Sequence, residues 1–363
     1  MPVFAKKPKG IEYYISKDWD CSQSTKNTYL NAYYQTKRCL ELQHQRKFGD
    51  IFDMLNYREY IMDWLDDYYK ERLASKKSKL CAYIRFLKEI PTQKENYDFY
   101  KKEWEKLKVQ MKKEYKSLTD KKKKNWIKYS DLKTYFFKQI NKCRKSVKIR
   151  NANSFKDLNQ LEYRLLEGTV LMSLWLSDPL ITPPRRSGTW AQMRVVRKKK
   201  NCRLCKEIME RQDGTIQNEE DRQNYLLLSR NRVEMIQFNN YKYSAYNAGG
   251  TTNFYNQYKN RNLQWLLRKW ISLSPESDYL FPKKSDTSNP WEQDFMTKMI
   301  TKHIKYGFPE KNVSSSMLRN IIITHYNKNH IFASQLPNWA RLCGHGVQTN
   351  LDHYTHNFEE EEN

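Results

Sequence analysis

Three residues near the end of the chain combine side chains that can act together on a phosphodiester. They are Arg319, His345 and Tyr354, and all lie within residues 314–357. A guanidinium can hold two phosphate oxygens at once, an imidazole can donate to a third, and a phenol can attack phosphorus to form a covalent ester. Tyrosine is abundant in this chain, so the order and spacing of the three residues carry the interpretation. They predict a site that cleaves a nucleic-acid strand.

The motifs around these residues are LRN at Arg319, LCGHG at His345 and HYTH at Tyr354. In this order they resemble the C-terminal catalytic motif of the tyrosine recombinase (phage-integrase) family. The resemblance implies cleavage through a 3′-phosphotyrosyl intermediate. It also implies two groups upstream: another arginine after an apolar helix, and a lysine on a β-hairpin.

The turn after residues 161–177 carries the candidates for the second arginine. Those residues are the most apolar helical segment of the chain, and the following sequence PPRR contains Arg185 and Arg186. The turn is similar to the PP-x-R signature of recombinases from Crypton-type transposons and from large DNA viruses of eukaryotes. In that signature the second arginine is catalytic, so we expect Arg186 to be catalytic, with Arg185 as the alternative.

Strand-like composition appears at residues 189–196, 224–228 and 233–238, and a two-asparagine turn then precedes Lys242. Lys242 is therefore the candidate for the hairpin lysine. The resemblance implies that this lysine protonates the leaving 5′-oxygen, a task that suits a mobile cation able to lose its proton.

The chain departs from the family at Ser316, three residues before Arg319, where recombinases usually have histidine or lysine. Serine can hydrogen-bond a phosphate, but it cannot act as a base near neutral pH. His325 lies further along the same predicted helix and is a possible substitute, with a structural role as the alternative.

Composition favours a polyanionic partner, because the chain of 363 residues has a net charge of +25. We expect double-stranded DNA rather than a membrane, since no segment approaches the ~18 apolar residues of a spanning helix. The N-terminus lacks the apolar core of a signal peptide, so an intracellular location is expected. Cys202 and Cys205 form one CxxC pair without a second pair, which favours a solvated loop over a metal site. No metal or cofactor is expected.

The expected fold is mainly α with a small antiparallel β-sheet. Periodic apolar residues predict helices at 24–41, 49–56, 57–73 and 76–88. The resemblance implies that residues 21–92 form a helical DNA core-binding domain, after an N-terminal tail at 1–20.

Residues 93–125 have the composition of a basic helical linker. Residues 126–357 are expected to form an α+β catalytic domain. Ser130 is the expected N-cap of the first helix of this domain. Residues 358–363 form an acidic tail. Four lysines of the linker are expected to contact DNA phosphates: Lys121, Lys122, Lys123 and Lys124.

These observations favour a site-specific recombinase that integrates or excises a mobile or viral element. The family implies a tetramer on two duplexes, and a eukaryotic host would imply the nucleus or the site of viral DNA replication. Because the phosphotyrosyl ester keeps the bond energy, neither ATP nor a metal ion is needed. A type IB topoisomerase and a cleavage-deficient DNA-binding relative are the alternatives.

Overall fold

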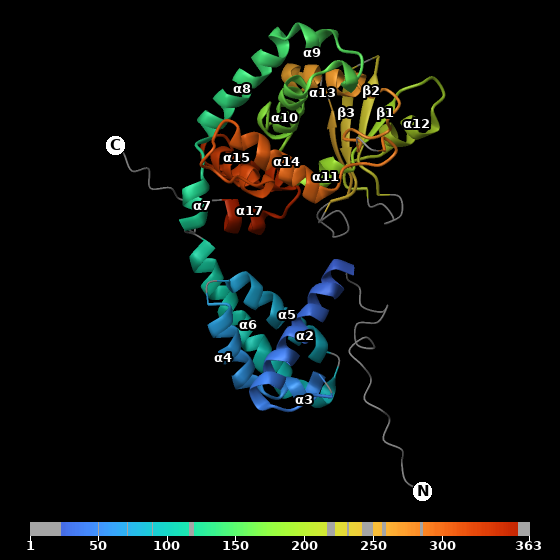
Figure 1. The fold of residues 1–363 in the computed structure, drawn as a ribbon. Helices are drawn as coiled ribbons and strands as arrows, with labels where there is room; N and C mark the ends of the chain where they lie inside the picture. Colours follow the sequence, from blue (N-terminus) through green and yellow to red (C-terminus); the bar gives the residue numbers. More distant parts are fainter. Residues whose placement is uncertain are drawn as a thin grey trace. The chain divides into compact units, whose positions relative to one another are not determined.

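The chain divides into two compact units, Met1–Tyr115 and Lys116–Asn363 (Figure 1). The computed structural model describes residues 23–49, 51–70, 72–88, 90–115, 120–215, 222–230, 232–241, 250–255, 259–283 and 286–354. Within these ranges the protein is mainly helical and has one small sheet, which confirms the predicted class. No helix in these ranges is both long and apolar enough to cross a membrane.

The first unit is a helical bundle with its own hydrophobic core. Its apolar residues recur at helical spacing, so each helix buries one face, for example through Leu65 of one helix and Leu80 and Tyr83 of another. The helices are α2 (Gln23–His44), α3 (Ile51–Leu55), α4 (Arg58–Tyr68), α5 (Leu73–Leu87) and α6 (Lys94–Tyr115).

Helix α6 belongs to the first unit and not to a linker. Tyr100, Leu107 and Met111 on α6 are buried in the core of that unit, and the Tyr100 hydroxyl donates to the carbonyl of Leu55 at 3.0 Å. Several charged residues of α6, such as Lys101, Lys102 and Glu105, are exposed on the other side of the helix. The boundary between the compact units falls after Tyr115, instead of the predicted linker at 93–125.

The second unit contains most of the helices and all described strands. Its longest apolar helix, α10, begins with Asn159 and Glu162 in a reciprocal capping box. Ser130 does not cap α8 as predicted, because the helix begins at Tyr129 with Lys128 at the N-cap. The helices are α7 (Asp120–Asn125), α8 (Tyr129–Lys145), α9 (Val147–Asn151), α10 (Gln160–Leu176), α11 (Ser187–Ala191), α12 (Arg203–Glu210), α13 (Arg261–Ser272), α14 (Gln293–Lys305), α15 (Ser315–Asn329), α16 (Leu336–Leu342) and α17 (Val347–Tyr354).

The sheet is mixed, whereas the sequence predicted an antiparallel one. Its strands β1 (Arg194–Arg197), β2 (Tyr225–Ser229), β3 (Arg232–Phe238) and β4 (Thr252–Tyr255) lie in sequential order. The β2–β3 and β3–β4 pairs are antiparallel, but β1 and β2 are parallel. A parallel pair needs a crossover, and the segment that contains α12 supplies it.

Two local predictions near this crossover are wrong. The expected strand at 189–196 is divided between α11 and β1. The CxxC segment is not a solvated loop: Cys202 is the N-cap of α12, and Cys205 is 2% exposed and packs against the sheet. Helix formation turns the apolar side of this short segment toward the strands, which a count of its lysines did not indicate.

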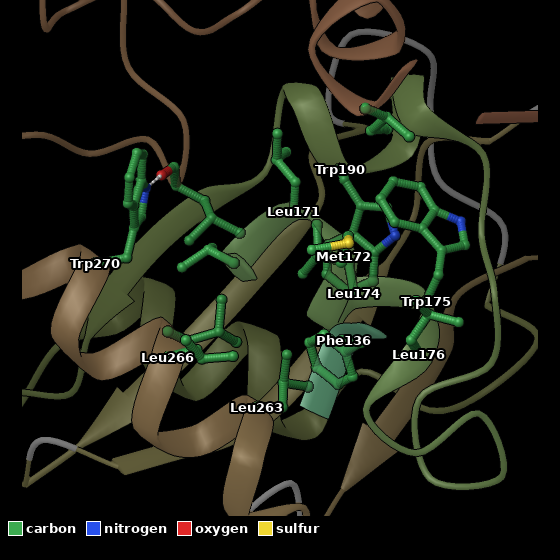
Figure 2. Close-up of a cluster of buried hydrophobic side chains, with 14 of the residues drawn as sticks. Phe136, Leu171, Met172, Leu174, Trp175, Leu176, Trp190, Leu263, Leu266 and Trp270 are labelled. Atoms are coloured by element: carbon green, nitrogen blue, oxygen red, sulfur yellow. Dashed lines mark hydrogen bonds between the residues drawn. The ribbon is translucent and has the colours of Figure 1, made fainter. Parts of the chain in front are cut away.

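The core of the second unit surrounds α10, which contacts α8 and α13 (Figure 2). Two of its tryptophans bury their rings and use their N–H groups as hydrogen-bond donors. Trp175 donates to the carbonyl of Arg185 at 2.8 Å, and Trp270 donates to that of Leu280 at 2.7 Å. The first of these bonds fixes the PPRR turn to the end of α10.

Candidate active site

Arg319 is the centre of a closed hydrogen-bond cluster. It lies in the second turn of α15 and is 3% exposed. Its Nε donates to the carbonyl of Pro184 at 2.9 Å, and Nη1 donates to the hydroxyl of Tyr354 at 2.8 Å. Its Nη2 donates to the carbonyl of Cys343 and to Nδ1 of His345. These bonds use four of the five guanidinium N–H groups and leave one on Nη1.

His345 is buried beside this guanidinium, with 4% of its surface exposed. The turn before it requires Gly344, which has a φ of +78° and would bring a Cβ within 2.7 Å of the Arg185 guanidinium. Burial and the charges of Arg319, Arg185 and Arg186 lower the pKa of His345 to about 2. The imidazole is therefore neutral at physiological pH.

The hydrogen bonds of His345 define its tautomer. Arginine can only donate, so Nδ1, at 2.7 Å from Arg319 Nη2, accepts and the ring proton is on Nε2. The side-chain amide nitrogen of Asn350 lies 3.0 Å from Nε2, and the amide oxygen of Asn350 accepts from Nδ2 of Asn327 on α15. Both ring nitrogens are engaged, so His345 orients the arginine in this state.

Tyr354 is the last residue of α17 and is 7% exposed. Its ring stacks on the imidazole of His345 with a centroid distance of 4.7 Å and an interplanar angle of 22°. Asn350 precedes Tyr354 by four residues, which puts the amide and the phenol on one face of α17. The structure thus brings the three motif residues of the sequence analysis into direct contact.

Arg185 is buried next to this cluster in a different environment. It is 1% exposed, and none of its side-chain nitrogens has a hydrogen-bond partner among the described residues. Its guanidinium lies over the rings of Phe238, Tyr241 and Phe254, at 4.8, 4.6 and 5.5 Å from their centroids. Burial lowers the pKa of Arg185 to about 10, so the group stays charged at physiological pH. We call this arrangement the aromatic cage.

Arg186 is exposed at the N-cap of α11. Its charge contributes to the lowered pKa of both Arg319 and His345. Arg186 is therefore near the cluster and remains accessible to a ligand. Of the two arginines in the PPRR turn, only Arg186 has both properties.

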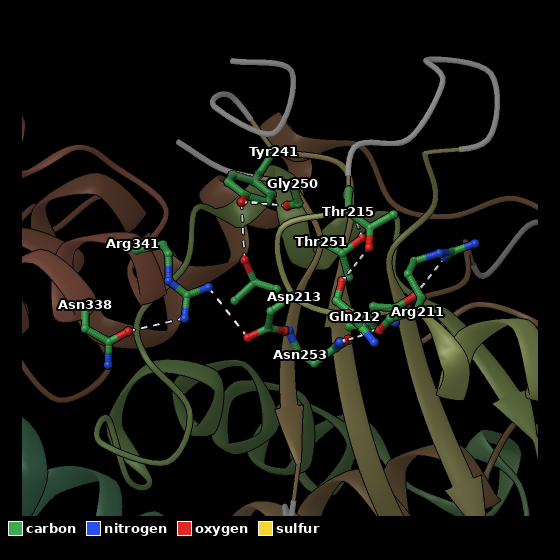
Figure 3. A network of polar contacts seen from close by, with 12 residues as sticks. Arg211, Gln212, Asp213, Thr215, Tyr241, Gly250, Thr251, Asn253, Asn338 and Arg341 are labelled. Carbon is green, nitrogen blue, oxygen red and sulfur yellow. Dashed lines mark hydrogen bonds and ion pairs between the residues drawn. The ribbon is translucent and has the colours of Figure 1, made fainter. Parts of the chain in front are cut away.

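The predicted hairpin lysine, Lys242, lies outside the described residues. The residue before it, Tyr241, donates its hydroxyl to the carbonyl of Gly250 at 2.8 Å. The neighbouring segment around Asp213 is joined to the same hairpin base, because Asp213 accepts from the backbone N–H of Asn253 at 2.8 Å. Asp213 also pairs with Arg341 of α16 at 3.6 Å (Figure 3). The hairpin base is thereby connected to the helix that precedes His345.

The remaining predicted residues lie apart from the cluster or at its edge. Ser316 is exposed in the first turn of α15. His325 stacks on Tyr129 with a centroid distance of 4.2 Å and contacts Asn329, and burial lowers its pKa. The structure does not bring His325 into contact with the three motif residues. The four predicted lysines, Lys121 to Lys124, lie in α7, where Lys123 and Lys124 are exposed.

Sequence reasoning missed the groups that hold the cluster in place. They are Asn350 and the backbone carbonyls of Pro184 and Cys343. The spacing of Asn350 from Tyr354 was an available signal, because a polar residue on the buried face of a helix needs a partner. The carbonyls carry no signal in the sequence.

Among the described residues, no group of three or more His, Cys, Asp or Glu side chains could hold a metal ion. No protein-family model matches the chain, and no curated protein sequence matches it. The candidate function therefore depends on the chemistry of the cluster itself.

Proposed function

We propose that this protein is a site-specific DNA recombinase in which Tyr354 is the nucleophile. The observation that carries the proposal is the 2.8 Å hydrogen bond from Arg319 Nη1 to the Tyr354 hydroxyl, with His345 stacked on the same phenol. A buried guanidinium is a strong phosphate ligand because it presents charge and directed donors together. The phenol oxygen already lies beside the group that would hold the phosphate.

The reaction begins when a DNA phosphate takes over donors of Arg319. Arg186 approaches from the solvent side, and the two cations stabilise the charge that grows on the phosphoryl oxygens in the transition state. The Tyr354 oxygen forms a bond to phosphorus and releases its proton to water, while the bond to the 5′-oxygen breaks. Lys242 supplies a proton to that leaving oxygen. The product is a 3′-phosphotyrosyl ester and a free 5′-hydroxyl strand.

A 5′-hydroxyl from a partner duplex then attacks the ester and gives its proton to Lys242, while the bond from phosphorus to the Tyr354 oxygen breaks and Tyr354 regains a proton from water. His345 keeps Arg319 and Tyr354 aligned through both steps. Since one phosphoester replaces another, the cycle is balanced without ATP hydrolysis.

The wider organisation follows from the same proposal. The helical unit Met1–Tyr115 acts as a DNA clamp, and the lysines of α7 contact backbone phosphates. Pairwise strand exchange requires a tetramer on two duplexes. The reaction integrates or excises a mobile or viral element inside the cell, in the nucleus or at the site of viral DNA replication for a eukaryotic host.

The test is covalent trapping on a random pool of nicked duplexes without magnesium, followed by sequencing of the attached DNA. We expect adducts enriched in one motif, in particular an inverted repeat. Adducts without sequence preference would instead indicate a type IB topoisomerase. Complete absence of adducts, with binding retained, would indicate a cleavage-deficient DNA-binding protein.

A further inference from the structure

A second basic site lies at the opposite end of the sheet from Tyr354. It is a pocket of about 640 Å³ between the ends of β1 and β2 and one side of α13. Strand β3 starts at Arg232, next to the pocket, and ends at Phe238, in the aromatic cage. Seven residues of strand span about 20 Å, at ~3.3 Å per residue. The pocket is therefore separate from the candidate active site.

Cations are concentrated in this pocket beyond the general basicity of the chain. Five of its ten lining residues are arginine or lysine, and none is acidic. In the whole chain, 66 of 363 residues are arginine or lysine. Both lysines have other partners: Lys198 pairs with Glu234 at 3.5 Å, and Lys269 donates to two backbone carbonyls. The three arginines are Arg197, Arg230 and Arg268, of which Arg197 has one contact, through Nη1.

Two of these arginines have features that suit an anion-binding site. The Nη2 of Arg197 is buried without a hydrogen-bond partner among the described residues, while its Nη1 makes a long 3.4 Å contact with the carbonyl of Ser277. Arg230 has a φ of +46°, a left-handed conformation that favours glycine or asparagine in a hairpin turn. The turn therefore has an exposed guanidinium where a smaller residue would fit its backbone better.

The other wall of the pocket is apolar. Leu228, Trp265, Ile271 and Pro275 line it beside the cations. A ligand that matches both walls has several negative charges joined to a flat apolar group. Guanidinium groups bind phosphate oxygens, and aromatic and aliphatic side chains cover a nucleobase.

We propose that this pocket binds a nucleoside phosphate, with the phosphates on Arg197, Arg230 and Arg268 and the base against the wall that contains Trp265. The source is either a free nucleotide or the terminal nucleotide of a single strand. Strand transfer through Tyr354 needs no nucleotide, so this site adds a function and does not depend on the proposed recombination.

Calorimetric titration of the full chain with ATP at low salt tests the proposal. We expect saturable binding that weakens at least tenfold in the double variant Arg230→Glu and Arg268→Glu, because two phosphate ligands become repulsive. The control is Lys302→Glu with Lys305→Glu on α14, which makes the same change of charge at two exposed lysines outside the pocket. We expect the control to bind ATP within twofold of the unchanged chain.

Tripolyphosphate should bind at least tenfold more weakly than ATP, since it has no base. A 5′-phosphorylated oligothymidine that displaces ATP identifies a strand end as the source, and failure to displace it identifies the free nucleotide. No binding of ATP or of the oligonucleotide, equal losses in the two double variants, or tripolyphosphate binding as tightly as ATP would overturn the proposal. Tyr354→Phe should bind ATP normally, which separates this result from the failure of strand cleavage.

Discussion

Two buried guanidinium groups lie close together in the second unit, but their environments are opposite. Arg319 is 3% exposed and donates four hydrogen bonds to the side chains and carbonyls around it. Arg185 is 1% exposed and has no hydrogen-bond partner within the described ranges, only the rings of the aromatic cage.

The difference separates two uses of a buried cation. A buried charge without hydrogen bonds costs stability, while one with full partners is held in a fixed geometry. Arg319 therefore holds the phenol of Tyr354 and the imidazole of His345 in fixed positions through hydrogen bonds from one guanidinium. Arg185 contributes positive potential to the same region without a directed contact, and it lowers the pKa of His345 together with Arg319.

The largest effect is expected for Arg319→Ala. It removes the phosphate ligand and leaves the carbonyls of Pro184 and Cys343 without a donor. We expect covalent adducts to fall by about 10²–10³-fold. We expect the free energy of unfolding to fall by about 2–6 kcal/mol, because each buried carbonyl without a donor costs about 1–3 kcal/mol. Adduct trapping and urea unfolding measure the two effects. Arg319→Lys, which keeps the charge but not the fork, should recover little of the activity.

The next effect concerns the two arginines of the PPRR turn. Arg185→Met replaces a buried cation that has no hydrogen-bond partner by an apolar side chain of similar length. We therefore expect the free energy of unfolding to rise by about 1–4 kcal/mol. Arg186→Met is the matched control, and it should leave unfolding unchanged while it lowers adduct formation. If Arg185→Met destabilises the protein and Arg186→Met keeps full cleavage, the roles assigned to the two arginines are reversed.

A smaller effect is expected from pH. The pKa of His345 is lowered to about 2 in the folded protein, against 6.5 when exposed, so the unfolded chain binds the extra proton between these values. The contribution of neutral His345 to the free energy of unfolding is complete above pH 6.5. It decreases as the pH falls below this value, by about 1.4 kcal/mol per pH unit for one group. The free energy of unfolding should therefore fall by about 1.4 kcal/mol between pH 5.5 and pH 4.5. His345→Gln should flatten this part of the profile, and an unchanged slope would contradict the buried neutral imidazole.

The smallest effect is expected for Asn350→Ala, which removes the side-chain amide that contacts Nε2 of His345. We expect the free energy of unfolding to fall by about 1 kcal/mol and the yield of covalent adducts to fall about tenfold. Gln348→Ala on the exposed side of α17 is the control and should change neither quantity. Equal activity in the two variants would show that Asn350 does not position the imidazole.

The helices could be predicted from the sequence where an apolar stripe is long. The segment 161–177 is within one residue of α10 at both ends. Periodicity was sufficient there because burial of one helix face decides the local structure. At α8 the predicted cap at Ser130 was wrong, since the hydroxyl residue lies one position inside the helix.

The bounds and directions of the strands were harder to predict from the sequence than the helices. Short apolar segments such as 189–196 fit a strand or a helix equally well, and tertiary contacts divided this one between α11 and β1. The direction of β1 depends on the α12 crossover, whose lysines resemble those of a loop. The position of Lys242 lies outside the described residues, so its assignment stays a prediction.

For the site, motif order was enough to select Arg319, His345 and Tyr354, which the structure brings together. The PP-x-R signature favoured Arg186 over Arg185, but the burial that separates the two arginines could not be predicted from the motif. The carbonyl partners of Arg319 come from segments far apart in the chain and appear only after folding.

The central claim is that the Tyr354 oxygen forms the covalent bond to DNA. The most direct measurement is mass spectrometry of protease-digested adducts formed on nicked duplexes, with Tyr354→Phe beside Tyr306→Phe, which changes an exposed tyrosine. We predict a nucleotide mass on the peptide that contains Tyr354, no adduct with Tyr354→Phe and normal adducts with Tyr306→Phe. A nucleotide on another residue, or adducts that persist in Tyr354→Phe, would contradict the account.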